Sequence, residues 1–194
     1  MKRVKRGAFN ALYPSLTTIV GCEVNGTPNW ITIAHVGTLN HASGDIAGYL
    51  SIGLHRSHYS NIGIREHREF SINVPSQGML EITDYAGLVS GSTVSKADLF
   101  EIERGELEHA PMIASCPVSM ELTLYDTVLL GHHEIFIGEI IATYVDESCL
   151  TENKPDLATI DPILFDMMKM DYWSLGERTG KPWRDGKKLK NRQD

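Results

Sequence analysis

The stretch LTTIVGCEVNGTPNWITIA, residues 16–34, predicts a β-hairpin at the start of the chain. Apolar residues alternate with polar or small ones through residues 16–24, as they do in a strand that is buried on one face. Asn25 and Gly26 follow, and this dipeptide best tolerates the positive φ angles of a type I′ turn. A second β-rich run begins at once, over residues 30–34. We therefore expect strands to dominate the first half of the chain.

Outward from this hairpin, the pattern predicts more strands with a few short helices between them. Strands are expected near residues 47–54, 70–74, 118–125 and 135–145. Helices are expected over residues 57–67, 79–89 and 96–103, and a proline-containing loop over residues 110–117. Ser57 is the expected N-cap of the first helix, because its hydroxyl can accept a hydrogen bond from a free N–H of the first turn. The strand at 135–145 is apolar on both faces, which is typical of burial in a barrel or beneath a dimer partner.

The domain organisation expected from this pattern is simple. Residues 1–194 contain no internal repeat, no low-complexity stretch and no linker. We expect one mainly β domain with inserted helices, with its core at about residues 12–177. Residues 178–194 are expected to form a solvated C-terminal tail.

The composition narrows the class of protein further. A net charge of −7 argues against sequence-independent nucleic-acid binding, which requires lysines and arginines facing the phosphates. No apolar run approaches the roughly 20 residues of a membrane span, and no signal peptide is expected. Cys22, Cys116 and Cys149 are far apart and odd in number, so they indicate neither a disulfide framework nor a zinc site. We expect a cytoplasmic protein.

Several segments, taken in order, resemble the flavin reductase-like, FMN-binding split-barrel family, and specifically its flavoredoxin-like branch. The segments are NWITIAHVG (29–37), SIGLHRSHYSNI (51–62), FSINVPS (70–76), DYAGLVSG (84–91), APMIASCPVSMEL (110–122), GHHEIFIGEI (131–140) and YWSLGE (172–177). They cover about residues 12–177 with roughly the family's spacing. The resemblance implies a single-domain, mainly β fold, a Greek-key split β-barrel. It also implies a homodimer with one FMN per subunit near the dimer interface.

The first candidate site is a phosphate cradle at residues 56–60. A helix N-terminus offers free N–H groups, Arg56 offers a bidentate donor, and the hydroxyls of Ser57 and Ser60 add hydrogen bonds. Taken alone, these residues also describe a capped helix with an exposed arginine; the resemblance favours the FMN phosphate. Relatives often carry arginine where this chain has His58. That histidine would weaken phosphate binding, or make it depend on pH near its ordinary pKa of about 6.5.

The resemblance assigns a second group of residues to the flavin ring. It consists of Asn29, Thr32, Ile33, Ala34 and His35. The strand would pack the isoalloxazine and reach its polar edge through main-chain groups, and His35 stands where relatives commonly have an aromatic residue. From pattern alone, this segment is simply a core strand. Protein groups at such a position tune the flavin, while the redox chemistry belongs to the cofactor.

The resemblance adds two further groups near the flavin. Ser90 and Gly91 form a turn expected close to the ring, and Lys96 is expected to reach the phosphate. Without the resemblance, these residues are a helix C-cap and a surface lysine. His133 matches a family position on the open face of the flavin, where it could orient the nicotinamide or supply a proton. We expect no metal site, because the adjacent His132 and His133 point to opposite faces of a strand.

Three functions are compatible with these features. The leading hypothesis is an FMN-dependent oxidoreductase in which NADH or NADPH reduces the flavin and electrons pass to free flavin, an iron centre or a redox protein partner. The alternative is a flavoredoxin-like electron carrier without appreciable NAD(P)H activity. A flavin- or haem-handling binding protein without turnover is the third. The sequence lacks a G-x-G-x-x-G fingerprint, and hydride transfer needs no catalytic triad, so neither absence separates the first two.

Overall fold

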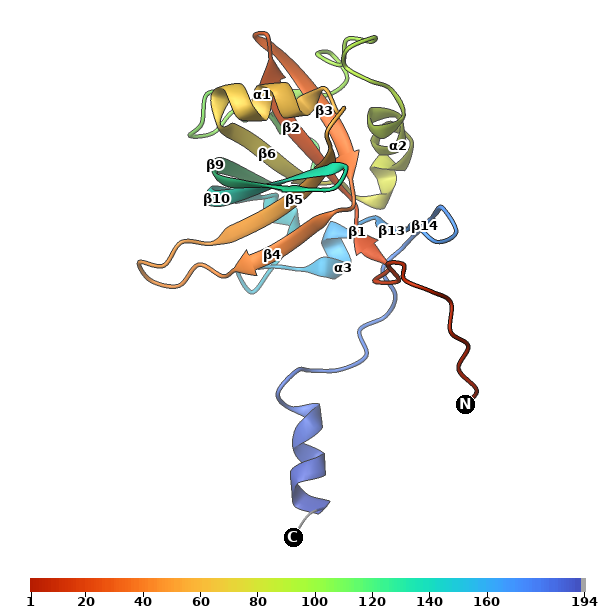
Figure 1. The fold of residues 1–194 in the computed structure, drawn as a ribbon. Coiled ribbons are helices and arrows are strands. Elements are labelled where there is room, and N and C mark those ends of the chain that lie inside the picture. The colour runs from red at the N-terminus through yellow and green to blue at the C-terminus, as the bar shows by residue number, and fades with distance from the viewer. Residues whose placement is uncertain (193–194) are drawn as a thin grey trace.

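Seven strands form one antiparallel sheet in the computed structural model, which describes residues 1–192 (Figure 1). Along the sheet their order is β3-β2-β6-β9-β10-β5-β4. Their bounds are β2 (Thr18–Val24), β3 (Thr27–Ile33), β4 (Val36–Asn40), β5 (Tyr49–His55), β6 (Glu69–Val74), β9 (Val118–Leu130) and β10 (His133–Val145). Three helices accompany the sheet: α1 (Ser60–His67), α2 (Leu80–Leu88) and α3 (Leu157–Ile160). The expectation of a mainly β fold is confirmed.

The sheet curls into a barrel that stays split between its two edge strands. β3 and β4 lie at opposite ends of the strand order, yet only Ala34 and His35 connect them. So short a connection spans no more than about 10 Å, so the two edges of the sheet must approach each other. The main-chain N–H of Gly53 in β5 donates to the oxygen of His35 at 2.8 Å, which holds this connection against the far edge.

The β2–β3 hairpin forms where the sequence predicts it. Asn25 and Gly26 have φ angles of 52° and 72°, as a type I′ turn requires, and Val24 pairs with Thr27 across it. The structure differs from the expectation in burying all seven residues of β2, rather than one face. The reason is that β2 has apolar material on both sides, with the barrel interior on one and a second cluster on the other.

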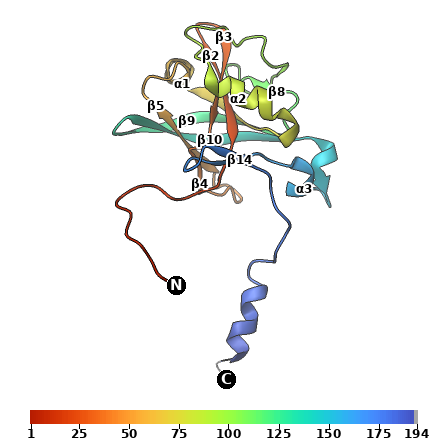
Figure 2. The ribbon, with the colours of Figure 1, turned by 90° about the vertical axis from the view of Figure 1, so that its right-hand side faces the viewer.

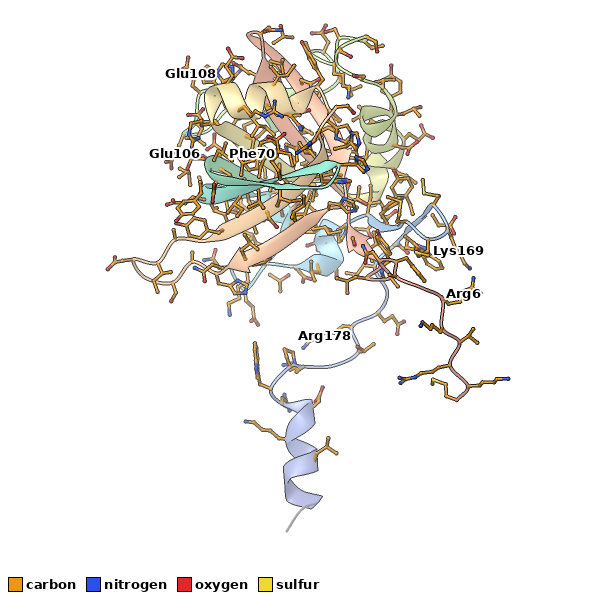
Figure 3. The ribbon with its side chains drawn as sticks, viewed as in Figure 1. Arg6, Phe70, Glu106, Glu108, Lys169 and Arg178 are labelled. Carbon is orange, nitrogen blue, oxygen red and sulfur yellow. The ribbon has the colours of Figure 1, made fainter. Side chains whose placement is uncertain are left out.

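Two apolar clusters occupy these two sides. The interior of the barrel contains Phe70 (labelled in Figure 3), Phe136 and Ile52, all fully buried. The outer cluster contains Trp30, whose ring meets that of Phe100 edge-on at 5.4 Å, and it is covered by α2 (Figure 2). Burial of such aromatic side chains dominates the energetics of a core of this size.

Helix α1 is held close to β2 by a glycine. A Cβ atom on Gly63 would lie 1.9 Å from the main-chain oxygen of Glu23, so any larger residue would push the helix away. The helix begins later than predicted: its N-cap is Tyr59, and no side chain caps it. The prediction that Ser57 caps the helix is therefore wrong. Its hydroxyl lies 2.8 Å from Nδ1 of His55 instead.

The other differences concern short segments. The predicted helix at 96–103 is wrong: that stretch forms turns and then β7 (Ile102–Glu103), which pairs with β8 (Met112–Ile113) inside the predicted loop. Edge strand β4 was not predicted. The remaining short elements are β1 (Ser15–Leu16), η1 (Gln77–Met79), η2 (Glu147–Cys149), β11 (Leu150–Thr151), β12 (Lys154–Pro155), β13 (Leu164–Asp166), β14 (Asp171–Trp173) and η3 (Asp185–Arg192).

The two ends of the domain meet in a small sheet of their own, of order β1-β13-β14. Ser15 pairs with Phe165, so the N-terminal segment lies beside the β13–β14 hairpin. Within the predicted tail, η3 extends away from the barrel (Figure 2), while residues 193–194 lie outside the described part of the chain. Among residues 1–192, no helix is long and apolar enough to span a membrane.

Candidate functional site

A cavity of 520 Å³ opens at the seam between the two edges of the barrel. It is bounded by β3, β5, the start of β10, helix α2, the N-terminal segment and the β13–β14 hairpin. The lining residues are Tyr13, Thr17, Thr32, Ile33, Ala34, His35, Gly53, His55, His58, Asp84, Gly87, Leu88, His133, Phe165, Met167, Met170 and Tyr172. Of the predicted site residues, the structure therefore brings together Thr32, Ile33, Ala34, His35, His58 and His133.

The β3 side of the cavity is fixed by helix α2. The hydroxyl of Thr32 donates a 2.5 Å hydrogen bond to the main-chain oxygen of Thr83. The helix can approach this closely because residue 87 is glycine: a Cβ atom there would lie 3.1 Å from that of Thr32. Because β3 is an edge strand, alternate main-chain groups on its outer side have no strand partner, and that of Trp30 accepts from the side chain of Lys96 instead.

Histidines form the opposite side. The ring of His133 lies 5.4 Å from that of His35 and 5.8 Å from that of His55. Burial, followed by the neighbouring histidines, lowers the pKa of both His133 and His58 below the ordinary value of 6.5. Both imidazoles are therefore largely neutral at pH 7. Within residues 1–192, no three histidine, cysteine or acidic side chains are placed to hold a metal ion.

The third side of the cavity consists of aromatic and methionine side chains of the β13–β14 hairpin. The turn of this hairpin carries Lys169 (Figure 3). The rings of Phe165 and Tyr172 lie 5.5 Å apart. The Tyr172 hydroxyl donates to Oδ1 of Asp84 at 2.8 Å, which joins the hairpin to α2. Burial and this carboxylate raise the pKa of Tyr172 to about 12. Sequence reasoning missed this side, although Tyr172 lies in one of the family-like segments.

The residues predicted to form the phosphate cradle differ in their exposure and in their partners. Arg56 and Ser57 are exposed beyond the end of β5, and only His58 lines the cavity. The main-chain N–H of Arg56 donates to the oxygen of His132, which joins β5 to the β9–β10 turn. Ser60 is buried, and its hydroxyl accepts a 2.8 Å hydrogen bond from the amide of Asn29. The first turn of α1 therefore begins beyond Ser57.

A second pocket, of 290 Å³, contains three more of the predicted residues: Asn29, Gly91 and Lys96. A Cβ atom on Gly91 would lie 2.0 Å from Oδ1 of Asn29, so the Ser90–Gly91 turn packs directly on that side chain. Ser90 itself lies outside the pocket lining, and its hydroxyl pairs with that of Ser92 at 2.8 Å. Asn29 therefore contacts both Ser60, from the predicted phosphate cradle, and the Ser90–Gly91 turn, which the sequence analysis treated as separate groups.

Lys96 occupies an unusual position for a lysine. Only 5% of the residue is exposed, so the interpretation as a surface lysine is wrong. Its Nζ donates to the main-chain oxygens of Trp30 and Ala86, both at 2.7 Å. Burial lowers its pKa from 10.5 to about 8. In this arrangement its ammonium joins β3 to α2, and its contact with a cofactor stays a prediction.

Comparison with known proteins places this geometry in a family. The family model described as flavin reductase like domain matches residues 10–173. Flavoredoxin from Methanosarcina acetivorans is 37% identical, with a TM-score of 0.92 over 97% of this chain and 100% of that chain.

Two further solved structures are similar. Flavoredoxin of Desulfovibrio vulgaris (Miyazaki F) is 30% identical, with a TM-score of 0.84 over 96% of this chain and 100% of that one. An FMN-binding protein from Thermus thermophilus, 21% identical, shares the fold, with a TM-score of 0.77 over 94% of this chain and 98% of that one. The chain therefore belongs to the flavin reductase-like family, whose members carry out flavin-related oxidation–reduction or electron transfer.

Proposed function

We propose that the chain binds FMN in the cavity at the barrel seam and passes electrons from NADH or NADPH to an acceptor. The observation that supports this most directly is a pair of unsatisfied polar atoms. Thr17 and His58 line the cavity, and in the described part of the chain Oγ1 of Thr17 and Nδ1 of His58 are buried without a hydrogen-bond partner. An unpaired buried polar atom costs about 1–3 kcal/mol, so such atoms at a cavity wall favour a polar ligand.

The rest of the cavity wall fits a flat ring system with a polar edge. Ile33, Ala34 and Leu88 offer apolar surface, and the outer edge of β3, which has no strand partner, would offer main-chain hydrogen bonds. The volume of 520 Å³ falls within the usual range of about 300–1,000 Å³ for small-molecule sites. FMN, when bound, supplies the capacity to accept a hydride and release electrons.

The residues of this chain would then position and shield the reactants. Thr32, Ile33 and Ala34 would hold the ring against α2, while Phe165 and Tyr172 would exclude water from the other side. His133 would orient the nicotinamide. Its imidazole, largely neutral at pH 7, can accept or return a proton at Nδ1 or Nε2.

A second candidate, an electron carrier without appreciable NAD(P)H activity, is favoured by the surface beside the cavity. Met167, Met168 and Met170 are 42%, 52% and 68% exposed on the β13–β14 hairpin. Flexible, polarisable thioethers are over-represented on surfaces that accept protein partners. A redox protein that docks there would approach the cavity from its aromatic side.

Anaerobic mixing separates the two candidates. The FMN-loaded protein is mixed with NADH or NADPH while the flavin band near ~450 nm is followed. Bleaching within seconds supports the reductase, whereas bleaching only after a reduced protein donor is added supports the carrier. A purified protein that is colourless and takes up no added FMN contradicts both.

We further propose a homodimer in a reducing, cytoplasmic compartment. Apolar side chains are exposed on the β4–β5 and β9–β10 hairpins, namely Leu39, Ile46, Val128, Leu129 and Leu130. Exposed apolar surface of this kind is typical of an interface. The three cysteines are buried and free, which suits reducing conditions. Light scattering coupled to size-exclusion chromatography tests the dimer, and a monomeric mass at micromolar concentration contradicts it.

A further inference from the structure

Most of the positive charge of the chain lies in two short segments near its ends. Residues 1–6 and 178–192 hold 11 of the 18 lysines and arginines. Residues 7–177 hold the other 7, against 23 aspartates and glutamates, which gives this part of the chain a formal charge of −16. The net charge of −7 therefore combines a strongly acidic barrel with two basic segments. The 11 cations are Lys2, Arg3, Lys5, Arg6, Arg178, Lys181, Arg184, Lys187, Lys188, Lys190 and Arg192.

The two basic segments start from the same side of the barrel. The first leads into β1 and the second follows β14, and both strands belong to the small sheet that borders the cavity. Figures 1 and 2 show both segments extending away from the barrel on that side. In Figure 3, Arg6 and Arg178 lie there, whereas Glu106 and Glu108 lie at the opposite end of the molecule. The molecule is therefore polarised in charge.

Both basic segments also carry large apolar side chains in exposed positions. These are Val4, Phe9 and Leu12 in the first segment and Leu189 and Trp183 in the second, and Trp183 is 89% exposed. Single exposed apolar residues are common on soluble proteins. Their repeated placement among lysines and arginines is typical of segments that lie on a membrane, where cations meet anionic headgroups and apolar side chains enter the boundary with the acyl chains. Tryptophan is particularly enriched at this boundary.

The length of the second segment solves the problem that an acidic barrel is repelled by an anionic surface. Residues 174–184, between β14 and η3, can span up to roughly 35 Å when extended. At physiological ionic strength, electrostatic repulsion is screened over about 8 Å. The cations can therefore contact lipid headgroups while the barrel stays beyond the range of the repulsion.

We propose that residues 1–12 and 178–192 together bind the anionic surface of a membrane and hold the barrel beside it, with the β1-β13-β14 sheet toward the lipid. Binding by both segments at once gives an affinity well above that of either segment alone. Nucleic acid carries the same negative charge, but it offers the aliphatic side chains of Val4, Leu12 and Leu189 no apolar phase to enter. The proposal concerns the basic segments alone and holds whether or not the cavity binds FMN.

The test is sedimentation of the full chain with lipid vesicles. One set of vesicles is phosphatidylcholine alone, and the other contains about 30% phosphatidylglycerol. We expect at least tenfold tighter binding to the anionic vesicles at about 50 mM NaCl, and loss of most of this binding at about 500 mM NaCl, because salt screens the attraction. On binding, the fluorescence emission of Trp183 should shift to shorter wavelength, and Trp183→Phe should lack this shift.

Two variants assign the binding to the segments. One combines Lys2→Gln, Arg3→Gln, Lys5→Gln and Arg6→Gln, and the other combines Lys181→Gln, Arg184→Gln and Lys187→Gln. Each cation near an anionic surface strengthens binding about fivefold, so each variant should bind anionic vesicles at least tenfold more weakly. Both segments extend away from the barrel, so the urea denaturation curves of both variants should match that of the wild type.

The matched control restores the net charge at the opposite end of the molecule. Glu106→Lys and Glu108→Lys, added to the first variant, return its formal charge to that of the wild type, and both glutamates are exposed. Binding should stay weak, because the position of the cations decides it. Restored binding in this control, equal affinity for neutral and anionic vesicles, or wild-type binding by either segment variant overturns the proposal.

Two further measurements test other partners for the basic segments. Duplex DNA that shifts the emission of Trp183, when anionic vesicles do not, assigns the segments to nucleic acid and overturns the proposal. Light scattering should give both segment variants the mass of the wild type. A lower mass in both variants, without vesicle binding by the wild type, assigns the segments to a second copy of the chain and also overturns the proposal.

Discussion

The hydroxyl of Thr32 and the main-chain oxygen of Thr83 are 2.5 Å apart, and this hydrogen bond joins the edge strand of the barrel to helix α2. The bond lies directly at the cavity wall. Its partners are 51 residues apart in the sequence, so it fixes the width of the cavity on that side by a contact between distant segments.

Replacing Thr32 by valine removes this bond and keeps the shape of the side chain. We expect a loss of about 1 kcal/mol in the free energy of unfolding, as for a typical intramolecular hydrogen bond. We also expect weaker FMN binding, because the strand can then move relative to α2. Urea denaturation and quenching of FMN fluorescence measure the two effects. Thr38→Val, at an exposed position in β4, is the control and should change neither; equal behaviour of the two variants contradicts the role of the bond.

Replacing Tyr172 by phenylalanine breaks the bond between the β13–β14 hairpin and α2. The hydroxyl donates to Asp84 at 2.8 Å, and without it the hairpin loses this link to α2 and keeps the pairing of β13 with β1 and the hydrogen bond from the amide of Gln77 to the main-chain oxygen of Trp173. We expect FMN to dissociate several-fold faster, with little change in unfolding free energy. The recovery of free FMN fluorescence after dilution measures this rate. Tyr125→Phe, at a residue that is 63% exposed, should leave the rate unchanged.

Lys96 gives a prediction for alkaline pH. Its pKa is 10.5 in the ordinary state and about 8 in the fold, so between these values the unfolded chain binds more protons than the native protein. The free energy of unfolding of the wild type therefore rises with pH in this window, relative to Lys96→Met. Denaturation curves at pH 7.5 and pH 10 test this. If wild type and Lys96→Met differ in free energy of unfolding by the same amount at pH 7.5 and at pH 10, Lys96 keeps its ordinary pKa in the fold.

Glu134 gives the opposite prediction at acid pH. Its side chain accepts from Arg65 and Asn61, and these partners lower its pKa below the ordinary 4.5. The stabilisation that the ionised Glu134 gives the fold is complete above about pH 4.5. It is lost as the pH falls through the lowered pKa that Glu134 has in the folded protein. We expect Glu134→Gln to cost about 1–3 kcal/mol at pH 7 and progressively less below pH 4.5. Glu66→Gln, at an exposed glutamate on α1, serves as the control and should show no such trend.

The strands could be predicted because their determinants are local. Asn25 and Gly26 fix the first turn through their own backbone preferences, and the alternation through residues 118–125 marks β9. The helix expected at 96–103 failed for a non-local reason. Lys96 and Phe100 are both drawn into the interior, Lys96 by two main-chain oxygens and Phe100 by the ring of Trp30. Such contacts override weak helix propensity.

The site divides in the same way. Thr32, Ile33 and Ala34 follow each other in the sequence, so a single matching segment was enough to predict that they lie together. The group of histidines at the cavity could not be predicted, since His35, His55 and His133 meet only through the pairing of β5 with β4 and with the distant β10. The side formed by the β13–β14 hairpin was missed for a similar reason: nothing near Tyr172 in the sequence indicates that Asp84 is its partner.

The pairing of Ser15 with Phe165 has a consequence for how the protein is made in the cell. The cavity is bounded by Tyr13 near one end of the chain and by Tyr172 near the other, so its walls are completed only after almost the whole polypeptide has left the ribosome. The N-terminal segment must wait, exposed, while the intervening strands are synthesised and folded. We therefore expect cofactor loading to follow translation, and nascent chains arrested before residue 164 to emerge without flavin.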